Sequence, residues 1–263
     1  MTKRIITSVI GLPLLIAVIY LGGFWLRAGL LLLSVIGLFE FYRALSGKSL
    51  LIHFTGYFFS AVYLLYIVDI GVHDHFLVML SAFILLTLVA TVVFYQKIKF
   101  ADCLITISGF FYVTFLLSFI YFVRGNSVYF VWLIFTSAST SDTFAYLVGR
   151  KWGRHKLAGT PSPGKTWEGC IGGILGAAIV GFIYGQVVIH FIGIEHPIVL
   201  HAMAVSVVGA VFSQFGDLFA SAVKRSVGIK DFGKILPGHG GILDRFDGIM
   251  AAAPVVYMVM IFI

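Results

Sequence analysis

The stretch that decides the fold is "MTKRIITSVIGLPLLIAVIYLGGFWL", residues 1–26, in which two basic residues precede an almost unbroken apolar run. An apolar run of about 20 residues crosses a hydrocarbon core of roughly 30 Å as a helix, which satisfies its backbone hydrogen bonds without water. The basic start is also typical of a secretory signal, but the run is long and no A-x-A-like cleavage site follows. We therefore expect a retained transmembrane helix, with Pro13 inside it.

The rest of the chain has the same apolar character. Hydrophobic residues make up 60% of the 263 residues, charged residues 11%, and the mean hydropathy is +1.05, whereas soluble domains are roughly half apolar. Similar runs recur and predict about nine spans, over residues 5–24, 28–46, 50–70, 76–96, 102–122, 128–149, 168–192, 197–223 and 246–263. The predicted fold class is an all-α, multi-pass integral membrane protein without a soluble domain.

The basic residues indicate the orientation in the membrane. If the N-terminus is cytoplasmic, 16 of the 18 Lys and Arg residues fall on the cytoplasmic side, leaving only Arg27 and Arg124 outside. The positive-inside rule demands such a bias, and in a bacterium the membrane would be the inner membrane. The net charge of +7 and the pI of 9.4 therefore record membrane topology, and we expect no nucleic-acid partner.

Polar residues divide the chain into two regions. Residues 1–127, with about five spans, contain few ionisable side chains, of which Glu40 is the main one. Residues 128–263, with about four spans, carry two longer cytoplasmic loops, 150–166 and 225–244, and most of the polar residues. We predict a membrane scaffold followed by a catalytic membrane region, with the site at the cytoplasmic ends of the last four spans. Cys103 and Cys170 show no metal-ligand spacing and are expected to be free thiols.

Two aspartates lie inside predicted spans. "DTFAYLVGR" from Asp142 and "DLFASAVKR" from Asp217 share one pattern, so two helices bring a carboxylate to the same depth. A carboxylate inside a span is costly unless it faces a polar cavity or a partner, which makes it a functional residue by default. Each aspartate begins a polar helix face: Asp217, Ser221 and Lys224 on one helix, and Asp142, Tyr146 and Gly149 on the other. Interhelical hydrogen bonding or ion pairing is the alternative, and it has more weight for Asp142.

The segment "GTPSPGKT", residues 159–166, matches the P-loop pattern G-x-x-x-x-G-K-[ST]. A P-loop follows a buried strand and binds phosphate through successive backbone N–H groups, but Pro161 and Pro163 remove two of these donors. Because the flanks are also membrane helices, we reject a nucleotide-binding ATPase fold. Lys165 and Thr166 remain candidates for phosphate binding, since they precede the N-terminus of a helix. The alternative is a basic loop that rests on anionic lipid.

The second loop reads "KRSVGIKDFGKILPGHGGILDRFD", residues 224–247, and combines basic residues, carboxylates and a glycine-flanked histidine. The glycines around His239 let the main chain approach a ligand closely. Asp244 and Asp247 lie at i and i+3 where the next span begins, hence on one helix face. Acidic residues at a helix N-terminus are also favourable caps, but capping does not require the sequence G-H-G-G before them.

The helix ends thus supply carboxylates and the loops supply cations. Mg²⁺ is held through one or two carboxylates plus substrate phosphates, and Lys, Arg and backbone N–H groups bind the phosphate oxygens. This is the equipment of phosphoryl or nucleotidyl transfer, in which positioning and charge stabilisation supply most of the catalysis. Its place at the membrane boundary predicts one water-soluble phosphate substrate and one lipid.

Segments of the last half resemble a known family. "SAVKRSVGIKDFGKILPGHGGILDRFD", residues 221–247, is similar to the C-terminal signature of the phosphatidate cytidylyltransferase (CDP-diacylglycerol synthase) family and meets its fixed positions. "SPGKTWEG", residues 162–169, is similar to the second motif of that family, and "SDTFAYLVGR", residues 141–150, resembles the segment before it. Residues 1–130 agree with the family only in forming several membrane spans.

The resemblance implies transfer of CMP from CTP to phosphatidic acid, giving CDP-diacylglycerol and pyrophosphate, in phospholipid biosynthesis. It also implies Mg²⁺, a second cation such as K⁺, and a homodimer in the lipid bilayer. Asp217 and Asp244 would bind the metal, Asp142 and Asp247 would support these ligands, and Asp247 is alternatively a helix-end charge. The expected catalytic and substrate-binding residues besides these are Ser162, Lys165, Thr166, Ser221, Lys224, Arg225, Lys230, His239 and Arg245, with Lys224 and Arg225 among the catalytic ones.

Three other functions are alternatives to this one. A CTP-dependent lipid kinase would transfer the γ-phosphoryl group to an alcohol. A CDP-alcohol phosphotransferase also uses D-x-x-D clusters, but its longer acidic pattern does not occur in this sequence. A transporter of anionic solutes would use Asp217 as a coupling site, but it predicts paired broken spans and access from both faces, whereas the polar groups here gather at the cytoplasmic end.

Overall fold

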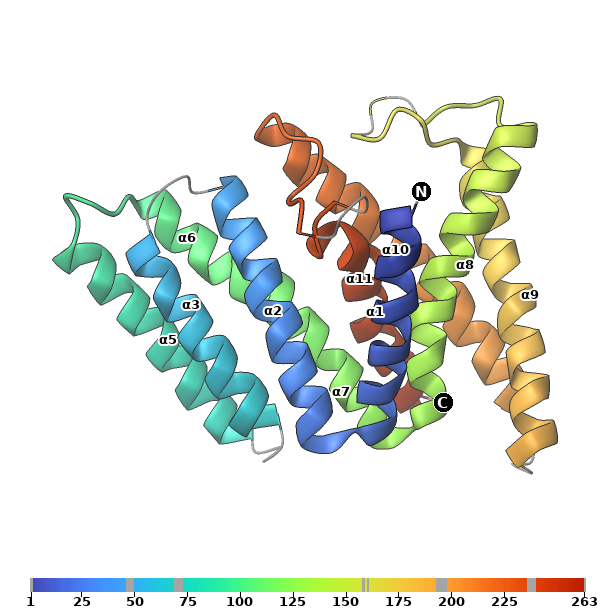
Figure 1. Cartoon of the computed structure of the whole chain (residues 1–263), viewed down its shortest axis with the longest axis horizontal. Helices are drawn as coiled ribbons and strands as arrows, with labels where there is room; N and C mark the ends of the chain where they lie inside the picture. Colours follow the sequence, from blue (N-terminus) through green and yellow to red (C-terminus); the bar gives the residue numbers. More distant parts are fainter. Residues whose placement is uncertain are drawn as a thin grey trace. The chain divides into compact units, whose positions relative to one another are not determined.

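The computed structural model describes residues 2–45, 50–68, 73–157, 159, 161–192, 198–235 and 240–262, and most of them are helical. Two π-helical turns, η1 (Tyr63–Ile67) and η2 (Phe110–Phe115), extend or join the α-helices. Within these ranges the only β-type pairing is one isolated bridge. The α-helices (Figure 1) are α1 (Thr2–Leu21), α2 (Gly23–Leu45), α3 (Leu50–Val62), α5 (His73–Val93), α6 (Phe100–Gly109), α7 (Leu116–Asn126), α8 (Val128–Trp152), α9 (Trp167–Ile192), α10 (Ile198–Ser226) and α11 (Leu243–Phe262).

Every predicted span falls on a helical segment, as expected for apolar runs that must satisfy their own backbone in lipid. α8 is long enough to span a membrane, but the run "TSASTSD", residues 136–142, makes its middle polar, and α8 is not among the six apolar segments given below. The chain is therefore an all-α membrane protein, while the number of nine spans and the orientation stay predictions. Among the described residues, six segments are long and apolar enough to cross a membrane: Gly23–Leu45, Asp74–Val93, Phe100–Asn126, Trp167–His190, Ile198–Ser226 and Leu243–Phe262.

The chain divides into two compact units. The first consists of Met1–Tyr121 with Asp231–Arg245, and the second of Phe122–Lys230 with Phe246–Ile263. The segment Asp231–Arg245, which lies in the second predicted region, thus belongs to the same unit as the N-terminal helices. The assignment of scaffold and catalytic roles to residues 1–127 and 128–263 stays a prediction.

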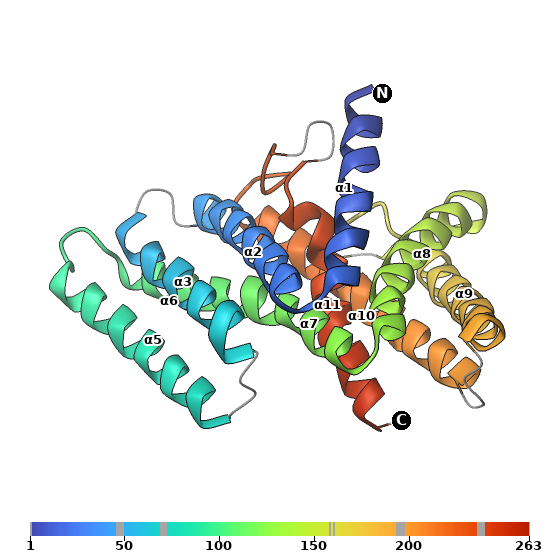
Figure 2. The ribbon, with the colours of Figure 1, turned by 60° about the horizontal axis from the view of Figure 1, so that its bottom comes forward.

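In the first unit, α2 and α5 lie against α3, and α6 contacts all three, as the ribbon views also show (Figures 1 and 2). Gly22 and Gly23, with φ of 64° and 46°, make the turn between α1 and α2 in a conformation that suits glycine. Buried hydroxyl groups tie the helices together, as between Ser60 and Thr114, whose side-chain oxygens are 2.7 Å apart. Such interhelical hydrogen bonds replace the hydrophobic driving force that lipid does not supply.

In the second unit, α8, α9 and α10 lie side by side (Figures 1 and 2). Glycines on α9 make this close approach feasible, as small residues do at membrane helix interfaces. A β-carbon at Gly169 would lie 2.8 Å from the carbonyl oxygen of Ala145, and one at Gly173 would lie 2.7 Å from that of Ser141. α8 and α9 therefore pack nearly backbone to backbone, which brings their polar side chains within reach of one another. Both cysteines are free thiols, as predicted.

Candidate active site

The loop between α8 and α9 is closed by backbone pairing. Lys156 and Thr166 form the isolated antiparallel bridge, Leu157 N–H donates to the Lys165 carbonyl at 3.0 Å, and Trp167 N–H donates to the His155 carbonyl at 3.0 Å. Among the described residues no strand precedes this loop, which agrees with the rejection of a P-loop fold. The pairing carries Lys165 and Thr166 to the first turn of α9.

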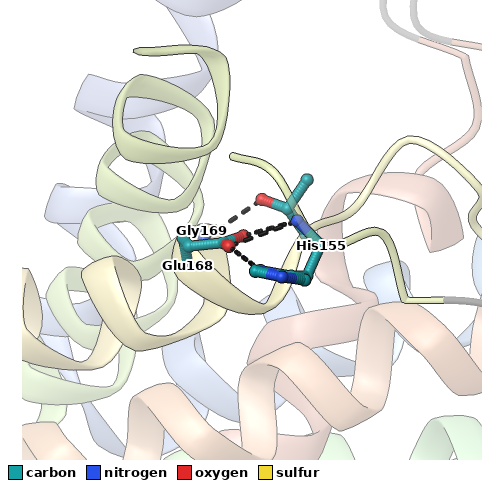
Figure 3. Close-up of polar contacts among 4 residues, drawn as sticks. His155, Glu168 and Gly169 are labelled. Atoms are coloured by element: carbon teal, nitrogen blue, oxygen red, sulfur yellow. Dashed lines mark hydrogen bonds and ion pairs between the residues drawn. The ribbon is translucent and has the colours of Figure 1, made fainter. Parts of the chain in front are cut away.

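An exposed pair fastens the same loop to the helix (Figure 3). His155 Nδ1 lies 2.6 Å from Oε1 of Glu168, which is in the first turn of α9. The backbone N–H of His155 also donates to both carboxylate oxygens of Glu168, at 3.2 Å each. An acidic side chain suits this end of a helix, where the unpaired N–H groups carry partial positive charge. One carboxylate thus holds both the main chain and the side chain of His155.

Thr166 caps α9. Its hydroxyl oxygen accepts a hydrogen bond from the backbone N–H of Gly169 at 3.1 Å, three residues into the helix, which is the geometry of an N-cap residue. The prediction that Lys165 and Thr166 precede the N-terminus of this helix is therefore confirmed. Ser162 lies in the same loop, where its carbonyl accepts a hydrogen bond from Lys165 N–H at 3.1 Å.

Lys165 and Asp217, two predicted site residues, form an ion pair. The Lys165 ammonium nitrogen is 2.5 Å from a carboxylate oxygen of Asp217 on α10, and the two side chains are 22% and 32% exposed. The pair is half-buried, so water screens it less than it screens a surface pair. It links the loop before α9 to the intramembrane carboxylate on α10.

A cavity of about 360 Å³ adjoins this pair in the second unit. Gln214, one of the lining residues, donates to the hydroxyl of Ser141 at 2.9 Å and to the carbonyl of Cys170 at 3.0 Å, which joins α10 to α8 and α9. The predicted polar face of Asp142, Tyr146 and Gly149 does line one cavity. The lining residues are Asp142, Ala145, Tyr146, Gly149, Arg150, Gly164, Lys165, Thr166, Gly169, Cys170 and Gln214.

Three carboxylates and a lysine interact around α10. Lys224 and Asp247 are both buried, at 9% exposure, and Asp247 interacts electrostatically with Asp217, Lys224 and Asp142. Asp247 Oδ1 also accepts the backbone N–H of Gly248 at 2.8 Å. The structure therefore groups Asp142, Asp217 and Asp247, which the sequence analysis placed in one site. Lys224 interacts with Asp247, and Lys165 pairs with Asp217.

The other basic residues predicted for the site are more exposed. Arg225 donates from Nη1 to the carbonyl of Ile229 at 3.3 Å, and Ser221, one turn before, is half-buried on α10. Lys230 and Arg245 are exposed. His239 lies outside the described residues, so its predicted role stays a prediction.

Asp244 belongs to the first unit, whereas Asp217 belongs to the second. One carboxylate oxygen of Asp244, Oδ2, accepts the backbone N–H groups of Phe232 at 2.9 Å and of Gly241 at 3.0 Å. Asp244 therefore links Phe232 to Gly241 within residues 221–247, which we call the signature segment. That Asp217 and Asp244 share a metal stays a prediction.

Glu40 contacts this segment, a role that the sequence analysis missed. The side chain is fully buried on α2 and its Oε2 accepts the backbone N–H of Leu243 at 2.9 Å. Arg43, one turn further along α2, donates from Nη2 to the carbonyl of Phe232 at 3.3 Å. The signal was present, since a Glu inside an apolar span is a functional residue by default, but the partner is a backbone group without a sequence signature.

The donors described above fit Mg²⁺ only together with a substrate. Among the residues that the structure describes, no three His, Cys, Asp or Glu side chains form a group that could hold a metal ion by themselves. Mg²⁺ does not require such a cage, because it keeps water and binds one or two carboxylates plus substrate phosphates. Asp217, one-third exposed beside the cavity, is a carboxylate of the kind this mode of binding needs.

Comparison with known proteins identifies the family. The model of the cytidylyltransferase family matches residues 2–263. The chain belongs to the cytidylyltransferase family. Within it, the chain is similar to a protein of Staphylococcus saprophyticus named phosphatidate cytidylyltransferase, with 34% identity over 267 residues and 99% of both chains covered. A protein of the same name from Staphylococcus haemolyticus is 32% identical over 265 residues, again with 99% of both chains covered.

A third family member comes from Thermotoga maritima and is also named phosphatidate cytidylyltransferase. It is 44% identical over 153 residues, which make up 56% of this chain and 55% of that protein. The resemblance that residues 141–150, 162–169 and 221–247 predicted is thus confirmed, and the similarity extends over the N-terminal helices as well.

Proposed function

We propose that this protein transfers CMP from CTP to phosphatidic acid, giving CDP-diacylglycerol and pyrophosphate for phospholipid biosynthesis. The observation that carries the proposal is the family match over residues 2–263, joined by relatives of the same length that are named phosphatidate cytidylyltransferase. A cavity lined by both polar and apolar groups, beside an ion pair on apolar helices, suits a reaction between a nucleotide and a lipid. The lipid kinase and the transporter have no comparable support.

In this proposal residues of the second unit supply most of the contacts to the phosphates of CTP. Lys165 lines the cavity and supplies a cation, and the N-terminus of α9 supplies backbone N–H groups and the positive end of the helix dipole. Arg150 also lines the cavity, on the side of α8. Ser162, Thr166 and Ser221 would donate hydrogen bonds, and Lys224, Arg225, Lys230, His239 and Arg245 would supply further contacts to phosphate oxygens.

The reaction requires no side-chain nucleophile. A phosphate monoester is already anionic near neutral pH, so an oxygen of phosphatidic acid attacks the α-phosphorus of CTP. The bond from that phosphorus to the bridging oxygen breaks, and pyrophosphate leaves with the electron pair. The task of the protein is then to align the two phosphates and to offset their charge.

Asp217 and Asp244 are the residues proposed to hold Mg²⁺, with Asp142 and Asp247 supporting them. Bound there, the ion would neutralise charge on the α-phosphate and on the departing pyrophosphate. A second cation, such as K⁺, is part of the same proposal. Titration of chelator-treated protein with Mg²⁺ and K⁺, followed by product formation, tests both requirements.

CTP labelled in the cytidine and in the γ-phosphate tests the reaction. In our proposal the lipid product carries cytidine and no γ-phosphate, whereas a CTP-dependent lipid kinase would label the lipid with phosphate alone. Asp217→Asn and Asp244→Asn should each abolish transfer in folded protein. Solute flux into liposomes without turnover of CTP would instead favour a transporter.

We also propose that the N-terminus and the site face the cytoplasm, on the basis of the positive-inside rule. In a variant without Cys103 and Cys170, single cysteines replacing Lys97 and Arg124 should react differently with an impermeant thiol reagent. In intact cells the cysteine at position 124 should be labelled and the one at position 97 protected. The reverse pattern would refute the orientation.

The proposed assembly is a homodimer in the bilayer, on the basis of the family resemblance alone. Native mass spectrometry of the protein released from nanodiscs should give twice the chain mass of 28.9 kDa. A single chain mass at all protein concentrations would refute it.

A further inference from the structure

Glu40 is a fully buried carboxyl group for which the proposed reaction provides no task. It lies on α2 with 0% exposure. A buried carboxyl group is costly unless hydrogen bonds satisfy it, and inside a membrane span the cost is larger. The contacts of Glu40 therefore indicate what it does.

The first contact is with the start of α11. Glu40 Oε2 accepts the backbone N–H of Leu243, the first residue of that helix, at 2.9 Å. The N–H groups of a first helical turn have no partner within the helix, and the dipole gives this end a partial positive charge. Glu40 thus caps α11 from a helix 203 residues away in the sequence.

The second contact is with two glycines of the signature segment. A β-carbon at Gly233 would overlap Glu40 Oε1, and one at Gly241 would overlap Oε2. Both positions are buried. The segment therefore closes directly on the carboxylate, and glycine is the residue that leaves room for it.

The same segment holds Asp244. Its Oδ2 accepts the N–H groups of Phe232 and Gly241. Phe232 directly precedes Gly233, and Gly241 itself lies against Glu40. Asp244 also directly follows Leu243, the residue that Glu40 binds. A displacement of Leu243 or Gly241 would therefore turn the carboxylate of Asp244.

We propose that Glu40 is a positioning residue, which caps α11 and packs against the surrounding glycines so that the carboxylate of Asp244 points in a fixed direction. It acts through Asp244 and contacts neither substrate nor metal. The inference rests on the proposed function, in which Asp244 binds Mg²⁺. Residues that orient a metal ligand typically contribute about 10- to 100-fold to activity or affinity.

The test compares Glu40→Ala, Glu40→Gln and the control Ser34→Ala in the full chain, purified into nanodiscs. Ser34 is also fully buried on α2, and it has no hydrogen-bond partner among the described residues. The measurements are kcat, KM for CTP, and hydrogen exchange of the Leu243 amide. Exchange reports the cap directly and does not depend on turnover.

Glu40→Ala should lower kcat about 10- to 100-fold, change KM for CTP little, and speed exchange at Leu243. Glu40→Gln retains an oxygen acceptor and should restore both readouts, which a general loss of stability would not allow. Ser34→Ala should match the wild type. Wild-type kcat and exchange in folded Glu40→Ala, or a Gln variant as impaired as the Ala variant, would overturn the proposal.

Gly233→Ala provides a second route if Glu40→Ala does not fold. Its methyl group would overlap Oε1 of Glu40 and displace the carboxylate, so kcat should fall and exchange at Leu243 should rise. Unchanged values would contradict the proposal. Asp244→Asn, assayed in parallel, separates the two hypotheses. Activity in Asp244→Asn would refute the proposed metal site. If Asp244→Asn is inactive while Glu40→Ala has the activity of the wild type, only the role of Glu40 is refuted.

Discussion

The ammonium nitrogen of Lys165 lies 2.5 Å from a carboxylate oxygen of Asp217, so a cation of the loop before α9 neutralises an anion in the C-terminal third of α10. The sequence predicts both residues for the site on separate grounds, Lys165 as a phosphate-binding cation and Asp217 as a metal ligand. Their pairing means that an incoming phosphate and a cation would each replace one half of an existing ion pair. The site can thus exchange one set of charge contacts for another without leaving a buried charge uncompensated.

Lys165→Ala should lower kcat/KM for CTP by about 100-fold, since one preorganised contact to a charged transition state is typically worth that much. Lys151→Ala is the matched control, because Lys151 is exposed and lies over the ring of Trp152 instead of lining the cavity. Steady-state rates at varied CTP concentration give kcat/KM for each of the two variants. Equal rates in the two variants would mean that Lys165 does not contact the nucleotide.

Gln214→Leu should loosen the three-helix unit, because it removes the hydrogen bonds to Ser141 and Cys170 at nearly constant volume. Interhelical hydrogen bonds in membranes contribute about 0.6 to 2 kcal/mol, so we expect a loss of about 1 kcal/mol in unfolding free energy. Denaturant titration in detergent measures it. The exposed Gln186 on α9, changed to Leu, serves as the control and should show no loss.

Gly173→Ala should destabilise the same unit by about 1 to 3 kcal/mol, as overpacking of a close interface does. The added β-carbon would meet the Ser141 carbonyl oxygen at 2.7 Å, and a backbone atom cannot rotate away. Gly125→Ala on α7 meets nothing within 4 Å and should be neutral or slightly stabilising. Thermal unfolding midpoints of the two variants would decide, and equal midpoints would mean that α8 and α9 adjust to the methyl group.

Glu168→Ala should free the loop before α9 more than His155→Ala does. The glutamate accepts from the ring and from the backbone N–H of His155, so the histidine variant loses only one of these contacts. We expect faster hydrogen exchange at the His155 amide and a severalfold higher KM for CTP, with the exposed Asp74→Ala as the control. Identical exchange in the two loop variants would show that the backbone contacts do not hold the loop.

The helices were predictable because lipid imposes them. Each apolar run became a helix, and the polar face predicted for Asp142, Tyr146 and Gly149 lines a cavity. These predictions depend on local periodicity and on the cost of unpaired backbone in lipid, both of which can be evaluated one segment at a time.

The partners of the charged residues were not predictable in the same way. The sequence offers several cations for Asp217, and the choice of Lys165 depends on how the bridge at Lys156 and Thr166 folds the loop back. The role of Glu40 was hidden for a related reason. Its partner is the N–H of Leu243, and a backbone donor is the same at every position except proline.

The bond between Glu40 and Leu243 also sets an order of assembly in time. At about 5 to 20 residues per second, the ribosome takes roughly 10 to 40 s to advance the 203 positions from Glu40 to Leu243. During that interval α2 enters the bilayer with a carboxyl group whose eventual partner has not yet been made. The insertion of α11 therefore supplies the hydrogen-bond partner of Glu40 on α2. A chain truncated before residue 243 leaves this carboxyl group without that partner inside its N-terminal helices, where membrane quality control can detect it.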